Sequence, residues 1–422
     1  MRLQKGCTAP APPKGPPHML SGQSLQLILG LGATLLLGAG LAMLAERWHV
    51  PDIVFFLLLG VALGPTLLGI VRPTELPGLA QAAVLLGAAY LLFEGGRSLD
   101  AKEIRAGWRS ILLLATLGVL VTTVVVALAA HLAFGLDAGA ALVVGAVLAP
   151  TDPAAIVPVL SGLRVVQRMR ALLVAESAAN DATGAALAFA LASGGYDVLA
   201  GLGHLGWSLL LGLVVGGAVG LGLHWLEGRL KGAQHGLRPL MALAALSSAF
   251  ALGTLLSASA FLAVFVAGLL AGRSHSRLRR RDPVAASFYE YSAGILSRLT
   301  RLIVFVLLGA SLVPSLLYHL ALPALAVTLA LMLVARPLTV LLLHLDRRAA
   351  YRWQELLLAS WVRETGVVPG ALAALLLAQG SPQADVVAAC VFAAVVLTLL
   401  VQAPTTRALA HRLGLVELPQ DS

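Results

Sequence analysis

The chain has 422 residues, of which 59% are hydrophobic and 12% charged, with a mean hydropathy of +0.91. Soluble domains carry about twice that share of charge, so the composition excludes an ordinary soluble protein and predicts a polytopic membrane protein. The net charge of +9 and the pI of about 10.1 come from arginines between apolar segments. That pattern reflects membrane topology and anionic lipid, and it argues against nucleic-acid binding.

The N-terminal residues 1–22 are proline-rich and are predicted to form a disordered tail rather than a signal peptide. Residues 23–407 are predicted to form the membrane domain, followed by a short cytoplasmic tail at 408–422. About 20 apolar residues cross the hydrocarbon of a bilayer. Thirteen segments fit this length: 24–45, 50–70, 78–95, 108–134, 139–160, 168–193, 201–227, 238–255, 257–273, 302–318, 321–344, 353–380 and 383–405.

Basic residues predict the orientation of these spans. The loops after the odd-numbered spans from the third to the eleventh hold clusters of Lys and Arg, whereas the even-numbered loops from the fourth to the twelfth hold none. By the positive-inside rule the odd loops and the C-terminus are cytoplasmic and the N-terminus is external. The tail, with Arg2, Lys5 and Lys14, departs from the rule. The expected location is the cell (inner) membrane.

The fifth span contains a predicted helix break. Pro150, Thr151, Asp152 and Pro153 lie in the middle of this apolar segment. Proline removes a backbone donor and clashes with the carbonyl four residues earlier. Opened backbone in a membrane is tolerated where it lines a cavity or is buried in protein, so this segment is a candidate site.

The sixth span carries two carboxylates, Glu176 and Asp181, within an apolar background. Ionisable residues at bilayer depth are costly and mark functional sites by default. On a helix, Glu176 stacks on Asn180 and Ser177 on Asp181, which gives one polar stripe. Arg336 in the eleventh span needs a buried partner. We expect it to pair with Glu176, which leaves Asp181 to exchange a proton for a cation.

The twelfth span contains a second predicted break, where Arg363 and Glu364 precede Gly366, Pro369 and Gly370. The two broken spans are seven apart, so corresponding spans run in opposite directions. The pattern predicts inverted repeats at about 24–193 and 238–405, joined by a connector span at 201–227. Paired interrupted spans in two inverted halves are typical of a secondary transporter with a site at mid-membrane.

Five motifs occur in order along almost the whole chain: Phe93 to Asp100 (FEGGRSLD), Thr151 to Pro153 (TDP), Glu176 to Asp181 (ESAAND), Ala335 to Pro337 (ARP) and the segment at Arg363. Together they make the chain resemble the monovalent cation:proton antiporter superfamily. The similarity is to its NhaP-like sodium/proton antiporter branch, which is related to eukaryotic sodium/proton exchangers. The resemblance implies an all-α NhaA-like antiporter fold of about 13 transmembrane helices, with two crossing discontinuous helices. It also implies a homodimer and no cofactor.

The resemblance assigns roles to particular residues. Asp181 corresponds to the essential cation- and proton-binding aspartate. Asn180 stands where the electrogenic branch has a second aspartate, which implies electroneutral one-for-one exchange. Additional ion-binding residues are Ser177, Thr151 and Asp152; the Na+ site is expected at Asp181, Ser177 and Thr151, and the structural ion pair at Glu176 and Arg336.

Three further residues are candidates: Glu94, Arg363 and Glu364. Glu94 either approaches the site through water or is a solvated surface acid beside Arg97. Family members typically have Gly after the arginine of the twelfth span. Glu364 departs from that pattern, which leaves the cation preference open and could favour potassium. Arg363 and Glu364 could equally pair with each other, and Asp152 could cap the broken helix instead of binding an ion.

The leading function is therefore an antiporter for Na+, or Li+, against H+. A K+/H+ antiporter of the same fold is the alternative. A cation channel fits less well, because it would need rings of ligands from an oligomer. An intramembrane hydrolase using Ser177 lacks a nearby histidine at membrane depth, and a metal enzyme lacks a His or Cys cluster.

Overall fold

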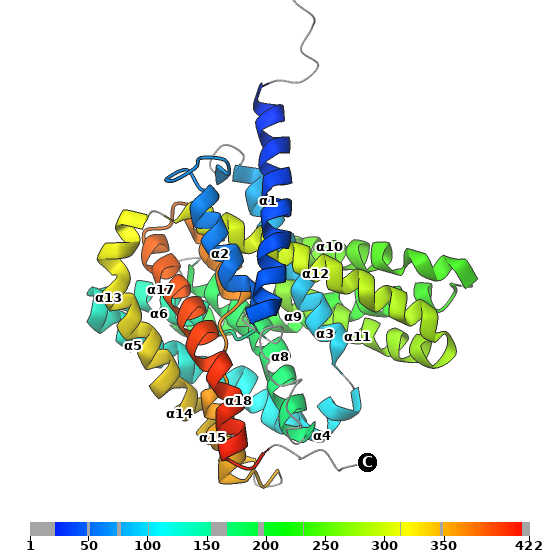
Figure 1. Cartoon of the computed structure of the whole chain (residues 1–422). Coiled ribbons are helices and arrows are strands. Elements are labelled where there is room, and N and C mark those ends of the chain that lie inside the picture. The colour runs from blue at the N-terminus through cyan, green and yellow to red at the C-terminus, as the bar shows by residue number, and fades with distance from the viewer. Residues whose placement is uncertain are drawn as a thin grey trace, which may run out of the picture.

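The structure is a computed structural model that describes residues 22–48, 51–73, 77–99, 101–152, 167–192, 198–230, 232–312, 314–346 and 349–415. Within these ranges the chain forms helices and turns and no strand. The helices pack around one another as shown in Figure 1. They are α1 (Gly22–Trp48), α2 (Asp52–Leu63), α3 (Pro77–Ser98), α4 (Ala101–Leu113), η2 (Leu114–Gly118), α5 (Val119–Phe134), α6 (Ala138–Leu148), α8 (Gln167–Ala192), α9 (Val198–Glu227), η3 (Gly232–Leu237), α10 (Arg238–Leu255), α11 (Ala260–Arg281), α12 (Pro283–Ser311), α13 (Pro314–Ala330), η4 (Leu331–Ala335), α14 (Arg336–Leu341), η5 (Leu342–Leu345), α15 (Trp353–Trp361), α16 (Val367–Ala378), α17 (Ala384–Leu397), η6 (Thr398–Gln402) and α18 (Ala403–Arg412).

The helices have the length and composition of membrane spans. Eight helical stretches among the described residues are long and apolar enough to cross a bilayer, and three shorter apolar helices accompany them. Large hydrophobic side chains such as Leu36, Leu132 and Leu255 are more than 70% exposed, which suits a surface in contact with lipid. The chain is an all-helical, multi-pass membrane protein. Its predicted tail at 1–22 lies outside the described residues apart from Gly22.

One predicted boundary is wrong. The sequence suggested a loop at 274–301 and a span at 302–318, but α11 continues to Arg281 and α12 runs from Pro283 to Ser311. Asp282 separates the two helices and starts the second, because its side chain accepts the backbone N–H of Ala285 over 3.0 Å. The polar, arginine-rich ends of both helices hid this continuation, since hydropathy alone marks only the apolar part of a helix.

Both predicted helix breaks are present. α6 ends at Leu148, and residues 149–152 are not helical; residues 153–166 lie outside the described part of the chain. α15 ends at Trp361 and α16 begins at Val367, so residues 362–366 are extended or irregular. The helix α8 passes directly against the first break. A Cβ atom at Gly184 would lie 2.7 Å from Cγ of Pro150, so only glycine permits this approach.

Among the described residues, three helical stretches contain a π-turn, a wider turn that often occurs at functional sites. The first, η2, lies between α4 and α5; the second, η4, between α13 and α14; and the third, η6, between α17 and α18. The turn η2 packs against both α8 and α14. Thr183 of α8 donates its hydroxyl to the carbonyl oxygen of Ala115 in η2 over 2.6 Å. This bond fixes α8 against the π-turn two residues after Asp181.

Candidate functional site

Thr151, in the first break, is bound to two polar residues of α8. Its backbone N–H donates to Oδ1 of Asn180 over 3.2 Å, and its hydroxyl donates to the Ser177 hydroxyl over 2.9 Å. The Asn180 amide donates back to the Thr151 hydroxyl over 3.0 Å. All three side chains are buried, at 3% exposure or less. The break therefore presents hydroxyl, amide and main-chain groups to the polar stripe of α8.

Asp181 follows Asn180 on α8 and is 6% exposed. Among the described residues, its Oδ1 atom has no hydrogen-bond partner. Buried polar atoms in folded proteins are nearly always paired with protein, water or an ion. An unpaired carboxylate oxygen at this depth is therefore suited to hold a proton or a cation.

Glu176 and Arg336 form a bidentate ion pair at the same level of the fold. Nη1 of Arg336 lies 2.6 Å from Oε1 of Glu176, and Nη2 lies 3.0 Å from Oε2. The remaining guanidinium nitrogen, Nε, donates to the carbonyl oxygen of Ala359 over 2.9 Å. Both side chains are 3% exposed. Each of the three guanidinium nitrogens makes one of these bonds, so the charge of Arg336 is already paired with Glu176 rather than with Asp181.

The two breaks touch each other through Asp152. Its backbone N–H donates to the carbonyl oxygen of Glu364 over 3.0 Å. Its carboxylate accepts the backbone N–H of Val367, the first residue of α16, over 3.3 Å. A Cβ atom at Gly366 would collide with the Asp152 carboxylate, so glycine is required here. Asp152 caps α16, which is one of the two roles that the sequence left open for it.

Arg363 also lies at the crossing, and its partners differ from those that the sequence suggested. Its Nη2 donates to the carbonyl oxygens of Leu148 and Ala149, over 2.8 Å and 2.9 Å, which are freed where α6 ends. Within the described residues neither oxygen of Glu364 has a partner. The local pairing of Arg363 with Glu364 is therefore absent from the structure.

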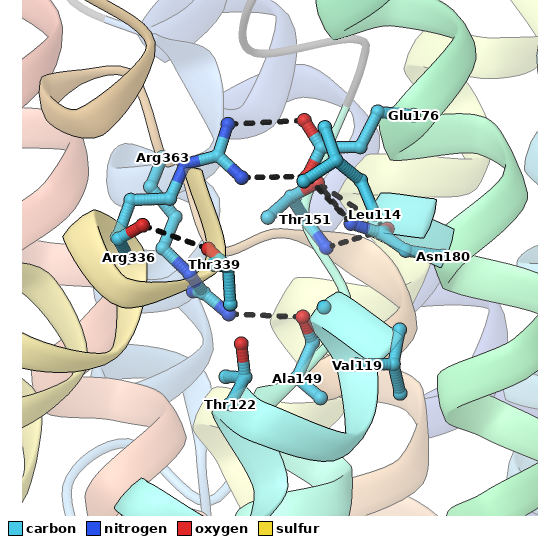
Figure 2. Close-up of a pocket in the computed structure, with 11 residues that line it drawn as sticks. Leu114, Val119, Thr122, Ala149, Thr151, Glu176, Asn180, Arg336, Thr339 and Arg363 are labelled. Atoms are coloured by element: carbon cyan, nitrogen blue, oxygen red, sulfur yellow. Dashed lines mark hydrogen bonds and ion pairs between the residues drawn. The ribbon is translucent and has the colours of Figure 1, made fainter. Parts of the chain in front are cut away.

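A small polar cavity lies beside these contacts (Figure 2). It holds about 10 Å³ of free volume, close to the minimum for one water molecule. The dashed lines in Figure 2 include the Glu176–Arg336 pair and the bonds between Thr151 and Asn180. Further lining residues come from the π-turn η2, the helices α5 and α14, and the two breaks: Leu114, Gly118, Val119, Thr122, Ala149, Thr339 and Arg363.

The candidate residues do not all share one set of contacts. Glu94 belongs to a separate group, in which Arg97 pairs with it through Nη2 at 2.6 Å. The described contacts of Glu94 therefore link it to Arg97 rather than to α8. Sequence reasoning also missed Thr183, Thr398 and Gln402, which are polar residues inside apolar spans. Their position at membrane depth was a signal that could have identified them.

This arrangement defines a class of protein. The end of α6 meets the irregular segment between α15 and α16 inside a helical membrane protein, next to an incompletely paired buried carboxylate. Ion-coupled secondary transporters have sites of this kind, where unwound backbone and half-helix ends bind the ion.

The comparison with protein families agrees with that class. Residues 32–412 match the family model described as "Sodium/hydrogen exchanger, transmembrane". The match covers most of the chain, and the chain belongs to this family. It is a family of transporters and not of enzymes.

Similar proteins include both potassium and sodium antiporters. The chain is 32% identical over 407 residues to the K(+)/H(+) antiporter NhaP of Alkalimonas amylolytica, covering 94% of this chain and 68% of that protein. It is 29% identical to the K(+)/H(+) antiporter NhaP2 of Shewanella sp. (strain MR-4), covering 90% of this chain and 65% of that one. The chain thus spans about two thirds of the length of these relatives.

The fold resembles that of a solved antiporter. The structure of the sodium proton antiporter MjNhaP1 from Methanocaldococcus jannaschii at pH 8 superposes with a TM-score of 0.77 and 26% sequence identity. The alignment covers 90% of this chain and 99% of that chain. The likeness therefore extends over most of the chain.

Proposed function

We propose that the protein is a secondary active antiporter that exchanges a monovalent cation for H+ across the membrane. The observation that carries the proposal is Asp181, a buried carboxylate with an unpaired oxygen, beside Thr151 where the first helix break meets α8. A group in this position gains from binding either a proton or a cation, and it cannot hold both. Competition for one carboxylate is the simplest basis for coupled exchange.

The cation site that we propose consists of oxygen donors around Asp181. Ser177 and Thr151 supply hydroxyl or main-chain oxygen, with Asn180 and Asp152 next to them. Alkali cations are hard ions that prefer such oxygen ligands. Since Ser177, Thr151 and Asn180 already hydrogen-bond one another, little rearrangement is needed to turn their oxygens toward an ion.

Within this proposal Glu176 and Arg336 form a scaffold. Each oxygen of the carboxylate faces a nitrogen of the guanidinium, and the third nitrogen is bound to Ala359 of α15. The pair thus joins α8, α14 and α15 with its charges compensated. It leaves Asp181 as the exchanging carboxylate of α8.

One-for-one exchange follows from Asn180. This neighbour of Asp181 is neutral, and its amide is occupied with Thr151. If Asp181 alone exchanges, one cation replaces one proton and no net charge crosses the membrane. Na+, and with it Li+, is the cation that we propose. K+ is the alternative, and the two K(+)/H(+) antiporters among the relatives are the observation in its favour.

We also propose the finer architecture of about thirteen spans with inverted repeats at 24–193 and 238–405 and a connector at 201–227. Two pairs of features support it. The breaks fall in the fifth and twelfth predicted spans, and the π-turns η2 and η4 fall in the fourth and eleventh. Both pairs are seven spans apart. Matching irregularities at matching positions are what an inverted repeat produces.

The orientation, with an external N-terminus and a cytoplasmic C-terminus in the inner membrane, remains a proposal from the arginine distribution. A homodimer remains a proposal from the family resemblance. The partners that the proposed function requires are the bilayer, the cation and the proton.

Purified protein in vesicles tests the function. An outward pH gradient is set, and Na+, Li+, K+ or choline is added while the membrane potential is held at zero and, in parallel samples, at a non-zero value by a potassium-independent method. We expect an alkali cation, and not choline, to dissipate the gradient at a rate independent of potential. Cation current without proton movement would contradict the antiporter and indicate a channel.

A further inference from the structure

A second group of buried polar side chains surrounds the break between α15 and α16, and the proposed function does not use it. Two of them lie in the irregular segment itself, and two are the first and last residues of the π-turn η6. All four have 0% exposure: Glu364, Thr365, Thr398 and Gln402. Polar residues concentrated at a π-turn inside a membrane helix point to a role other than packing.

Two contacts hold the segment against η6 and the start of α18. The backbone N–H of Thr365 donates to the hydroxyl of Thr398 over 3.1 Å, and the indole of Trp361 donates to the hydroxyl of Thr405 over 3.0 Å. The stretch from Trp361 to Thr365 and the helical stretch from Thr398 to Thr405 therefore run in opposite directions. α18 packs beside α15, as the red and orange helices in Figure 1 show. Gln402 lies between Thr398 and Thr405 along its helix. Its backbone is therefore next to the stretch of chain between Trp361 and Thr365.

The polar atoms of this group are largely unpaired. Among the described residues, no hydrogen-bond partner exists for either carboxylate oxygen of Glu364, for the hydroxyl of Thr365, or for the oxygen and nitrogen of the Gln402 side chain. Buried polar atoms normally hydrogen-bond to protein or water, or bind an ion. These atoms lie on two segments of the chain that the bond between Thr365 and Thr398 joins, so they are candidates to share one ligand.

The charges favour a cation as that ligand. The guanidinium of Arg336 is committed to Glu176 and Ala359, and Nη2 of Arg363 is committed to two carbonyl oxygens. Nη1 of Arg363 has no hydrogen-bond partner among the described residues, and it does not bond to Glu364. Neither arginine forms an ion pair with Glu364 in the described part of the chain. A buried carboxylate without a positive partner is costly. One monovalent cation would neutralise it.

We propose that Glu364, Thr365, Thr398 and Gln402 form a second binding site for an alkali cation, separate from Asp181. The carboxylate, the two hydroxyls and the amide oxygen give a donor set made only of oxygen, which hard cations such as Na+ and K+ prefer. The site links the break to η6, so an ion there fixes α15, α16 and α18 relative to one another. This inference rests on the proposed function for the identity of the ion.

Thermal unfolding of the purified protein tests the second site, with Asp181→Asn as the background that removes the first. Binding at 100 times Kd multiplies the folded-to-unfolded ratio by about 100, which raises the unfolding temperature. We expect Na+ or K+, compared with choline, to raise the unfolding temperature of Asp181→Asn. The rise should be lost when Glu364→Gln or Thr398→Val is added.

Two variants serve as matched controls. Thr398→Ser keeps the hydroxyl and should keep the rise, and Asp385→Asn removes a charge from the exposed start of α17 and should keep it too. Gln402→Leu replaces Glu364→Gln as the test if the latter does not fold. The second site is contradicted if Na+ and K+ raise the unfolding temperature of the unmodified protein but not that of Asp181→Asn. This result is expected if Glu364 binds only a proton. Absence of both a rise and exchange in the unmodified protein would instead contradict the proposed function.

Discussion

The backbone N–H of Asp152 donates to the carbonyl oxygen of Glu364 over 3.0 Å, and this bond joins the segment that follows α6 to the segment between α15 and α16. The carboxylate of Asp152 also accepts the first N–H of α16. One residue thus connects the end of α6 to the beginning of α16. The position of one break is therefore tied to that of the other by these two bonds.

The cap and the charge of Asp152 can be separated by substitution. Asp152→Asn keeps a side-chain oxygen for the N–H of Val367 but removes the negative charge, whereas Asp152→Ala removes both. We expect Asp152→Asn to fold normally and to bind the cation more weakly, since the charge helps to hold it. Asp152→Ala should in addition lose about 1 kcal/mol of stability, the usual cost of an N-cap. The apparent KM for the cation and the unfolding temperature are the two measurements. A KM unchanged in Asp152→Asn would leave capping as the residue's sole role.

Gly366 is predicted to tolerate no side chain. A Cβ atom at this position would overlap the Asp152 carboxylate, so Gly366→Ala should displace Asp152 and reduce exchange severely. Gly217→Ala is the matched control, because a Cβ there meets no atom within 4 Å. Exchange rates and unfolding temperatures of both variants check the prediction. If Gly366→Ala behaved like Gly217→Ala, the crossing described here would be incorrect.

The ion pair of Glu176 and Arg336 is predicted to be a scaffold. Removing one partner leaves a buried unpaired charge, which typically costs about 3–5 kcal/mol, whereas replacing both by apolar residues costs much less. We therefore expect Glu176→Met and Arg336→Met each to lower the unfolding temperature strongly, and the double variant to recover most of the loss. A double variant as unstable as the sum of the singles would show that the two residues do not act as a pair.

Asn180 is predicted to determine the stoichiometry. Asn180→Asp keeps an oxygen for the N–H of Thr151 and adds a second titratable carboxylate next to Asp181. We expect exchange by this variant to become sensitive to membrane potential, because two protons can then move for one cation. Transport currents on supported membranes, compared with the silent unmodified protein, measure this directly. Currents already present in the unmodified protein would contradict one-for-one exchange.

Much of the fold could be predicted because it follows from local chemistry. Pro150 beside Pro153, and Gly366 beside two charged residues, interrupt apolar segments, so both breaks were visible in the sequence, and apolar length located most of the described helices. The extent of α11 and α12 was missed because their ends are helical but charged. The contact between Glu176 and Arg336 was expected from the need of each charge for a partner.

Other features depend on tertiary structure and left little trace in the sequence. Arg363 binds the carbonyl oxygens of Leu148 and Ala149, which become available only because α6 ends there. The π-turns η2, η4 and η6 lie in apolar stretches in which no residue pattern predicted them. Gln402 was overlooked as one polar residue in an apolar span, although its depth alone marked it as unusual.

The central claim is that the proton and the cation compete for the carboxylate of Asp181. The most direct measurement is cation–proton exchange by Asp181→Asn in vesicles, with each alkali cation in turn and with the unfolding temperature recorded for the same preparation. Asparagine keeps the volume of the side chain and removes its ability to release a proton. We expect a folded protein whose exchange is abolished for every cation. Exchange that persists in Asp181→Asn, with its dependence on pH unchanged, would contradict it.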